Sequence, residues 1–354
     1  MDWLVAAAGA FLVVVVALDV FQAVILPRPV VGSRVGIARA LIFWTWRMWR
    51  GYCLGLASVA RERRLALYGP SLLVTLLGVW VLLLALGYGA ILFALRADVR
   101  PEPADLWAAV YLAATSLLTI GFGDLVPTAA ASRAVALIAG ASGLILVALS
   151  ITFIFSLYAF LQRRELLVTT LDQRAGGAPP SGIALLETHA TFGMIDDLPR
   201  IFAAWELWSA EVLDSHLAYP LLTYFRSSHD NESWVSALGA MLDAATLCET
   251  TIQNVPSGQA TMLRRAGSHL VEDVTAYFNM AHEHEPGVER PEFDLARERL
   301  AAVGYSLRDA DASWEAFSTL RAGYAADLNS MARYWAVPPA QWIGDRSPMP
   351  HRLA

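Results

Sequence analysis

Six consecutive residues, Thr-Ile-Gly-Phe-Gly-Asp at 119–124, could do chemistry with their backbone as much as with their side chains. Glycine adopts backbone angles that other residues avoid, so Gly121 and Gly123 allow successive carbonyl groups to face the same side. A row of such oxygens could replace the water around a bare cation. We take this stretch as the main candidate site.

A short helix must position this stretch. Residues 105–118 have a helical composition, they follow Pro101 and Pro103, and Asp105 suits the N-cap position. The segment is too short to cross a bilayer and return. It therefore predicts a re-entrant helix, because non-helical backbone at membrane depth is tolerated only beside protein or water.

Three apolar runs are long enough to cross a bilayer, which takes about 20 residues. They cover 3–26, 72–95 and 134–161, and the second and third carry no charge. The first run is too long for a signal peptide and lacks a basic start, so we expect it to be retained. Asp19 lies inside it, and two interpretations stay open: a functional carboxylate, or one paired with an arginine of 36–64.

Residues 36–58 are apolar but are interrupted by Arg39, Arg47 and Arg50. On a helix these arginines share one side, and tryptophans at 44, 46 and 49 suit a membrane interface. We expect an interfacial helix here, and a fourth span is the alternative.

Arginine placement predicts the orientation. Eight arginines lie between the first two spans, and Arg163 and Arg164 follow the third. If both places face the cytoplasm, the N-terminus and residues 96–133 face outward, and everything after the third span is cytoplasmic. We expect a multi-pass protein of a prokaryotic plasma (inner) membrane, with the lipid bilayer as a partner.

Composition excludes several classes of protein. Hydrophobic residues make up 56% of the 354 residues and charged residues 16%, which disfavours an ordinary soluble enzyme. There is no lysine; residues 1–164 are net positive, and residues 165–354 are strongly acidic and contain all seven histidines. An acidic half does not bind nucleic acid through phosphates. Cys53 and Cys248 lie far apart and predict neither a disulfide framework nor a zinc site.

The motif and the two spans around it resemble the potassium channel superfamily, whose filter is commonly Thr-Val-Gly-Tyr-Gly-Asp. Residues 70–162 would correspond to its outer helix, pore helix, selectivity filter and inner helix. Ile120 and Phe122 depart from the commonest form, although Gly-Phe-Gly is a variant within the family. Leu118 stands where many members have a second threonine.

The resemblance implies site residues and an assembly. Potassium would bind at the carbonyls of Thr119, Ile120, Gly121 and Phe122, with Gly123 and Asp124 completing the filter. The family builds its ring of carbonyls from four chains, so a homotetramer is implied. Tyr111 or Trp107 would hydrogen-bond to Asp124 from behind. Gly143 lies about where family members carry a hinge glycine, and Gly140 is near it; close helix packing by small residues is the alternative.

The second half predicts an α-helical bundle. Helical periodicity covers 198–214, 234–251, 259–280, 293–303 and 313–335, and we find no alternating strand pattern. A Gly-x-Gly-x-x-Gly nucleotide fingerprint is absent from the sequence. The bundle therefore matches no sensor that its residues identify, and its gating ligand stays unassigned.

Other candidate sites are weak. The sequence His282-Glu-His284-Glu285 suggests a metal, but histidines two apart do not share a helix face. Residues 224–234 suit either a ligand pocket or a turn in which Asn231 or Ser233 caps the next helix. Neither Asp196-Asp197 nor Asp309-x-Asp311 forms a calcium loop. Nothing resembles a nucleophile with its base, so we expect no enzyme activity and no cofactor beyond potassium as the permeant ion.

The sequence thus predicts an all-α membrane protein. We expect three transmembrane helices, a re-entrant pore helix and an interfacial helix, followed by a cytoplasmic helical domain. The expected segments are 1–66 (first span and interfacial helix), 67–164 (pore domain), 165–182 (linker), 183–340 (helical domain) and 341–354 (tail). The expected function is passive potassium conduction, gated or assembled through the acidic domain. Two alternatives are a membrane-anchored sensor or scaffold with a non-conducting pore-like domain, and a potassium transporter with a filter-like loop.

Overall fold

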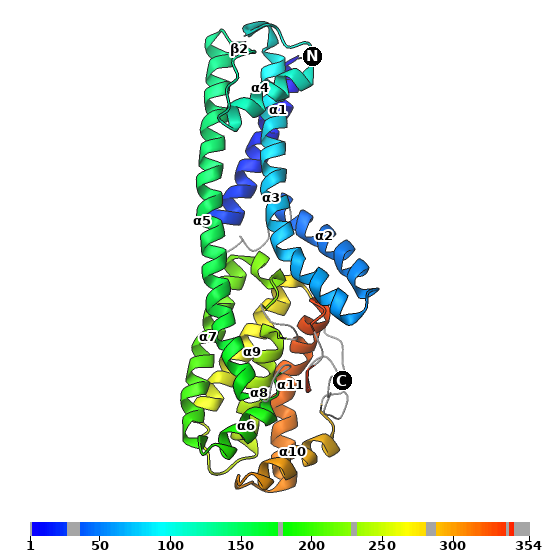
Figure 1. Cartoon of the computed structure of the whole chain (residues 1–354), viewed down its shortest axis with the longest axis vertical. Coiled ribbons are helices and arrows are strands. Elements are labelled where there is room, and N and C mark those ends of the chain that lie inside the picture. The colour runs from blue at the N-terminus through cyan, green and yellow to red at the C-terminus, as the bar shows by residue number, and fades with distance from the viewer. Residues whose placement is uncertain are drawn as a thin grey trace. The chain divides into compact units, whose positions relative to one another are not determined.

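The computed structural model describes residues 2–26, 36–175, 180–227, 232–280, 288–337 and 340–342 (Figure 1). Within these ranges the chain is helical almost throughout, as expected. It divides into two compact units, one made of Met1–Tyr52 and Leu67–Tyr158 and the other of Cys53–Ala66 and Ala159–Ala354. Helices α3 (Ser58–Ala94) and α5 (Ala130–Arg174) each contribute residues to both units.

The first unit contains the apolar helices. Among the described residues, three helical segments are long and apolar enough to cross a membrane: Asp2–Ile25, Ser58–Ala94 and Ala130–Arg174. The first consists of α1 (Asp2–Val20) and a π-helical turn, η1 (Phe21–Ile25). The amphipathic helix α2 (Ile37–Leu54) is not among the three. The prediction of three spans is therefore confirmed, and the charged residues of α2 explain why it does not add a fourth.

Helix α1 packs on α3 through two glycines. A Cβ on Gly9 would lie 2.5 Å from the carbonyl oxygen of Gly87, so only glycine allows this approach. Ten residues further along α1, the buried carboxylate of Asp19 accepts hydrogen bonds from the Trp80 indole, at 2.8 Å, and from the backbone N–H of Ala38, at 3.1 Å. Asp19 thus joins α1 to α3 and to the N-terminus of α2, where a negative charge is favoured.

Helix α2 packs on α3 through aromatic residues. The Trp46 ring lies 4.9 Å from that of Tyr68, and the Tyr68 hydroxyl lies 2.9 Å from the Thr45 hydroxyl. Trp46 is 4% exposed, whereas Trp44 is 62% exposed. The two tryptophans therefore differ in role: Trp46 belongs to the α2–α3 contact, and Trp44 remains available to an interface.

The short helix α4 (Leu106–Leu117) lies between α3 and α5 (Figure 1). A Cβ on Gly89 of α3 would lie 2.5 Å from the side chain of Val110, and a Cβ on Gly143 of α5 would lie 1.7 Å from the carbonyl oxygen of Leu117. The two glycines let α4 sit against both long helices. This packing fixes where the chain after Leu117 begins.

A small sheet holds the far end of this unit. After α3 come η2 (Arg96–Asp98) and β1 (Val99–Arg100), which pairs antiparallel with β2 (Val126–Pro127). The Asp98 carbonyl accepts from the Thr128 backbone N–H and from the Ser132 hydroxyl. The chain that leaves residues 119–124 is therefore tied back to the end of α3.

The second unit is a helical bundle. It contains α6 (Gly182–Thr191), η3 (Ile195–Asp197), α7 (Leu198–Ala218), η4 (Pro220–Tyr224), α8 (Trp234–Thr250), α9 (Gly258–Phe278), α10 (Arg290–Ala302) and α11 (Ala310–Tyr334). The five expected helices correspond to α7 through α11 with only small shifts at their ends. An isolated β-bridge joins Ile252 to Leu307.

The expected linker at 165–182 needs correction. Helix α5 continues to Arg174, so the first ten of these residues are helical. The expected boundary at 66/67 also differs, because residues 53–66 group with the bundle. The prediction placed the linker where the apolar run ends. The length of that run reflects the thickness of the bilayer, whereas the helix itself extends beyond it. Glycine does not appear until Gly176 and Gly177, and nothing earlier breaks the helix.

Helix α8 forms the centre of the bundle, and nearly all its residues are buried. It packs against α6, α7, α9 and α11. Small residues allow this close packing: a Cβ on Gly182 of α6 would lie 2.5 Å from the carbonyl oxygen of Ala240. A helix that is apolar on all sides is stable only when it is surrounded in this way.

A charged pair is buried between α8 and α11. Asp243 of α8 is 1% exposed and Arg321 of α11 is 3% exposed, and their atoms lie 2.9 Å apart. The Tyr324 hydroxyl donates to the same carboxylate oxygen at 2.7 Å. The arginine also donates to the Trp342 carbonyl. Each charge thus has its partners, as burial requires.

We predict that Gly143→Ala destabilises the first unit. The added methyl would overlap the carbonyl of Leu117, so α4 or α5 must move, which costs roughly 1–3 kcal/mol. Thermal unfolding of the purified protein in detergent measures this. The matched control is Gly78→Ala, because a Cβ there meets nothing within 4 Å. Equal melting temperatures for the two variants would contradict the packing argument.

We also predict that Asp243→Asn destabilises the bundle, because the Arg321 guanidinium would keep its burial and lose its counter-charge. Breaking a buried pair in this way costs about 3–5 kcal/mol. Denaturant unfolding followed by circular dichroism measures the loss. As the control, Arg290→Gln removes ion pairs with Asp294 and Asp311 at the surface and should change the transition by less than about 1 kcal/mol.

Candidate functional site

Helix α4 places its C-terminal end inside the first unit. The Asp105 side chain caps it by accepting from the Ala108 backbone N–H at 2.8 Å, as expected. Its inner face is apolar and buried, with Ala109, Leu112 and Ala113 among its residues. The helix then ends at Leu117, beside α5.

The chain turns sharply after α4. The carbonyl of Thr115 accepts hydrogen bonds from the backbone N–H groups of Ile120, at 2.8 Å, and Gly121, at 3.3 Å. The Thr119 N–H bonds to the carbonyl of Ser116 at 3.0 Å. These bonds fix residues 119–121 directly to the last turn of α4, so the helix determines where the motif begins.

Every second residue of the motif has a positive φ. The angles are 57° at Thr119, 61° at Gly121 and 81° at Gly123. Glycine takes this conformation freely, whereas a β-branched threonine takes it at a cost of roughly 1–2 kcal/mol. Such strain persists only where the surroundings hold it, and the bond to the Ser116 carbonyl does so here. The glycines of the motif are therefore required by its backbone.

The motif is uncovered by the rest of its own chain. All residues from 118 to 124 are exposed, and Phe122 is 68% exposed. A Cβ built on Gly121 or on Gly123 would meet nothing within 4 Å. A polar backbone with this sequence, left bare within an otherwise apolar unit, has room beside it for an ion or for further protein.

Tyr111 supports the far end of the motif. Its ring stacks on that of Phe122, with centroids 6.4 Å apart and an interplanar angle of 2°. Its hydroxyl hydrogen-bonds to the Asp124 carboxylate. Of the two aromatic residues expected at this place, Tyr111 makes the bond, and Trp107 is 68% exposed. The motif is thus fixed at both ends: the backbone of α4 holds its first residues, and Tyr111 holds its last ones.

The two glycines proposed as a hinge lie within uninterrupted helix. Helix α5 runs through Gly140 and Gly143, and both approach the C-terminal end of α4. A Cβ on Gly140 would lie 3.4 Å from the Ser116 carbonyl, which is ordinary contact. The packing role of Gly143 is therefore visible, and a hinge role stays a prediction.

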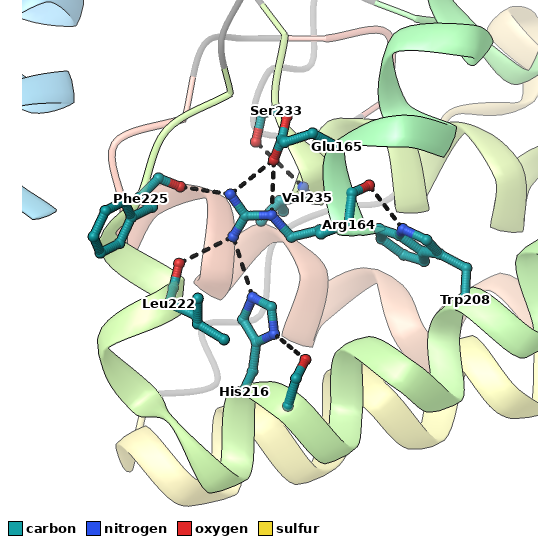
Figure 2. Close-up of polar contacts among 9 residues, drawn as sticks. Arg164, Glu165, Trp208, His216, Leu222, Phe225, Ser233 and Val235 are labelled. Carbon is teal, nitrogen blue, oxygen red and sulfur yellow. Dashed lines mark hydrogen bonds and ion pairs between the residues drawn. The ribbon is translucent and has the colours of Figure 1, made fainter. Parts of the chain in front are cut away.

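A second functional feature, in the bundle, is Arg164, which sequence reasoning had treated only as a membrane-flanking charge. Its side chain is 1% exposed, and all five of its N–H donors have partners (Figure 2). They reach the carboxylate of Glu165, the ring of His216, and the carbonyls of Leu222 and Phe225, at 2.7–3.2 Å. The Arg164 backbone carbonyl accepts from the Trp208 indole at 2.9 Å. This cluster, the Arg164 anchor, fixes α5 to α7 and η4.

One pattern could have revealed the anchor. Arg164 shares a buried helical face with Val168, Leu171 and Ala175, at spacings of four, three and four residues. Arg163, one residue earlier, is exposed. An arginine in line with an apolar stripe, beyond the end of a span, indicates a buried charge that must find partners in the next domain.

Arg226, two residues beyond η4, makes a related contact. Its guanidinium donates to the carbonyls of Trp335 and Ala336 and lies 3.7 Å from the carboxylate of Glu62 in α3. Residues 222–226 therefore receive Arg164 from α5 and Glu62 from α3. In the described part of the stretch expected to be either a pocket or a turn, Arg226 makes this contact between helices and Ser233 caps α8 as predicted. Asn231 lies outside the described residues.

The weaker candidates have structural roles or fall outside the structure. Asp309 caps α11 by accepting from two backbone N–H groups, and Asp197 pairs with Arg200 at 2.7 Å. His282, Glu283, His284 and Glu285 lie outside the described residues. Within the described ranges, no group of three or more histidine, cysteine or acidic side chains could hold a metal.

Comparison with known proteins agrees with this geometry. Residues 79–159 match a family model described as "Ion channel" (Ion_trans_2). The match begins in α3, includes α4 and the motif at 119–124, and ends in α5. The chain is also similar to "Uncharacterized membrane protein YdjJ" of Bacillus subtilis (strain 168), with 24% identity over 258 residues, which is 71% of this chain and 73% of the relative. No solved structure matches it.

The resemblance drawn from the motif is thereby confirmed at the level of the family. The chain is a membrane protein, and its segment 79–159 matches the model of the pore-loop ion channel family.

Proposed function

We propose that this protein is a potassium-selective channel that conducts passively through a pore formed by four copies of the chain. One observation carries the proposal. The Thr-Ile-Gly-Phe-Gly-Asp stretch follows a short capped helix between two span-length helices, is bare on one side, and has a positive φ at every second residue.

The backbone explains why a cation is the expected ligand. When residues alternate between left- and right-handed conformations, successive carbonyl groups turn toward the same side. A row of such oxygens replaces the hydration shell of a monovalent cation, which otherwise could not leave water. The ligands would be the carbonyls of Thr119, Ile120, Gly121 and Phe122, with Gly123 and Asp124 completing the mouth. The C-terminal end of α4 adds a partial negative charge nearby.

The exposed residues support an assembly around this stretch. One chain supplies one row of carbonyls, whereas coordination on all sides needs several rows. Along α5 many large apolar residues are exposed, including Leu137, Leu144, Ile145 and Ile151. In the assembled protein, lipid and neighbouring subunits would cover them, with cyclic symmetry placing each motif on the axis.

The distribution of arginine supports an orientation in the plasma (inner) membrane. The loop and helix before α3 are rich in arginine, and more arginine follows the apolar part of α5. The N-terminus would face outward and the acidic bundle would be cytoplasmic. The bundle would then act on the pore through α5, because the Arg164 anchor fixes that helix within it.

Flux into liposomes tests the channel. We expect potassium flux well above sodium flux, blocked by barium. Gly121→Ala should reduce it tenfold or more, because the positive φ would strain an alanine by roughly 1–2 kcal/mol in each subunit. Gly78→Ala, in open space on α3, is the control and should conduct normally. Folded protein without flux under any condition tested would favour the scaffold instead.

The assembly is tested separately by native mass spectrometry of the purified protein in detergent. We expect a species of four chains, because four rows of carbonyls surround one ion in the proposed pore. A monomer or dimer that still conducts potassium would contradict the proposed assembly.

A further inference from the structure

Two histidines in the bundle are bonded to arginines of α5. His216 of α7 is 2% exposed, and its Nε2 lies 3.2 Å from Nη1 of Arg164. His189 of α6 is 1% exposed, and its Nε2 lies 3.2 Å from Nη1 of Arg174. The two arginines come from the same end of the same helix. Figure 2 shows the first of these pairs.

The hydrogen bonds define the protonation state of both rings. Arginine can only donate, so each Nε2 must accept and carries no proton. The Nδ1 of His189 donates to the carbonyl of Leu185 at 2.7 Å. The Nδ1 of His216 lies 3.1 Å from the Ser215 hydroxyl, which donates its own proton to the Val212 carbonyl, so Nδ1 is the donor of that pair. Both histidines are therefore neutral while the arginine bonds exist.

We propose that these two pairs, Arg164–His216 and Arg174–His189, form a proton latch. At neutral pH they hold residues 164–174 of α5 in the bundle, and acidification of the solution around the bundle releases them. A proton added to either Nε2 replaces the acceptor by a second donor and places two positive charges about 3 Å apart. Both charges are buried in the Arg164–His216 pair, whereas the Arg174 side chain is 35% exposed.

The charges around His216 favour this response. Arg164 of α5 is the charged group that acts on the ring, and the nearby Glu165 is already bonded to that guanidinium. From α8 the ring meets the Trp234 indole, 5.1 Å away between centroids, and not a carboxylate. Burial and Arg164 together hold the pKa of His216 well below its usual range.

Around His189, groups that lower the pKa of the ring and groups that raise it partly cancel. Burial and Arg174 lower its pKa, and Asp197 of η3 opposes them, although Asp197 is also bound by Arg200. Helices α8 and α10 also pack against α6. On α8, Asp243 pairs with Arg321 and Glu249 with Arg264, and on α10, Arg299 pairs with Glu187 of α6. The net shift at His189 is still downward.

The direction of the pH effect follows from these signs. A released histidine titrates near pH 6.5, whereas an anchored one resists protonation. The released state therefore binds more protons as the pH falls below about 6.5, and the latch is fully closed only above it. At pH 5.5 His216 should favour release by up to about tenfold, and His189 by less, because its pKa is lowered less.

Hydrogen–deuterium exchange of the full-length protein in lipid nanodiscs tests the latch. After correction for the intrinsic exchange rate, we expect protection of residues 164–174 to fall by about tenfold or more between pH 7.5 and 5.5. In the double variant His189→Gln/His216→Gln it should change less than about twofold, because glutamine accepts from arginine but does not titrate. His269→Gln, at an exposed histidine on α9, should respond like the unmodified protein.

A second measurement needs no variant. Exchange of the histidine ring Cε1 hydrogens, read by mass spectrometry, gives a midpoint for each histidine. We expect midpoints below about 6.5 at both His189 and His216. Ordinary midpoints at these two residues, or an unchanged pH response in the double variant, would overturn the latch.

Any effect on conduction rests on the proposed channel function, but the release of α5 does not. If exchange follows the predicted pattern and no potassium flux is found at any pH, the latch stands and the channel fails. If flux is present and its pH profile is the same with and without the double substitution, the latch does not regulate the pore, and that part of the proposal is wrong.

Discussion

The contact between Gly143 and the carbonyl of Leu117 is the constraint on which the first unit depends. It sets how closely α4 approaches α5, and with it the position of the Thr115 carbonyl that holds Ile120 and Gly121. A peptide stretch without regular structure is tolerated at membrane depth only when protein or water satisfies it. Here the carbonyls of the last turn of α4 accept hydrogen bonds from the first residues of the motif, and the Tyr111 hydroxyl bonds to its last residue, Asp124. The middle is left bare, which is where an ion is expected.

Helix α5 links that constraint to the bundle through a single unbroken element. Its first part carries Gly143, and its last part carries Arg164 and Arg174. A buried guanidinium with five satisfied donors is costly to extract, because each lost bond would leave a buried polar group unpaired. The bundle therefore holds α5 by polar contacts of defined geometry. Such contacts can be switched by a change of charge, whereas apolar packing cannot.

Much of this arrangement was predictable from the sequence, because its signals are local. Apolar length gives the spans, Asp105 and Ser233 mark helix starts, and the alternating glycines mark the motif. The end of α5 was misplaced because no glycine or proline follows the apolar run until Gly176. The distance of Gly143 from the motif along the sequence does not show whether this glycine is a hinge or a packing residue. Apart from the adjacent Glu165, the partners of the Arg164 guanidinium lie 52 to 61 residues away, so only the folded bundle brings them together.

The carboxylate of Asp19 has a consequence for how the chain is made. Its indole partner, Trp80, is synthesised 61 residues later, and the start of α2 follows Asp19 by nearly twenty. Until both have emerged from the ribosome, the first helix carries an uncompensated acid that the hydrocarbon phase disfavours. The insertion machinery would thus retain α1 at its lateral exit until α3 arrives, and the two would enter the bilayer as a pair.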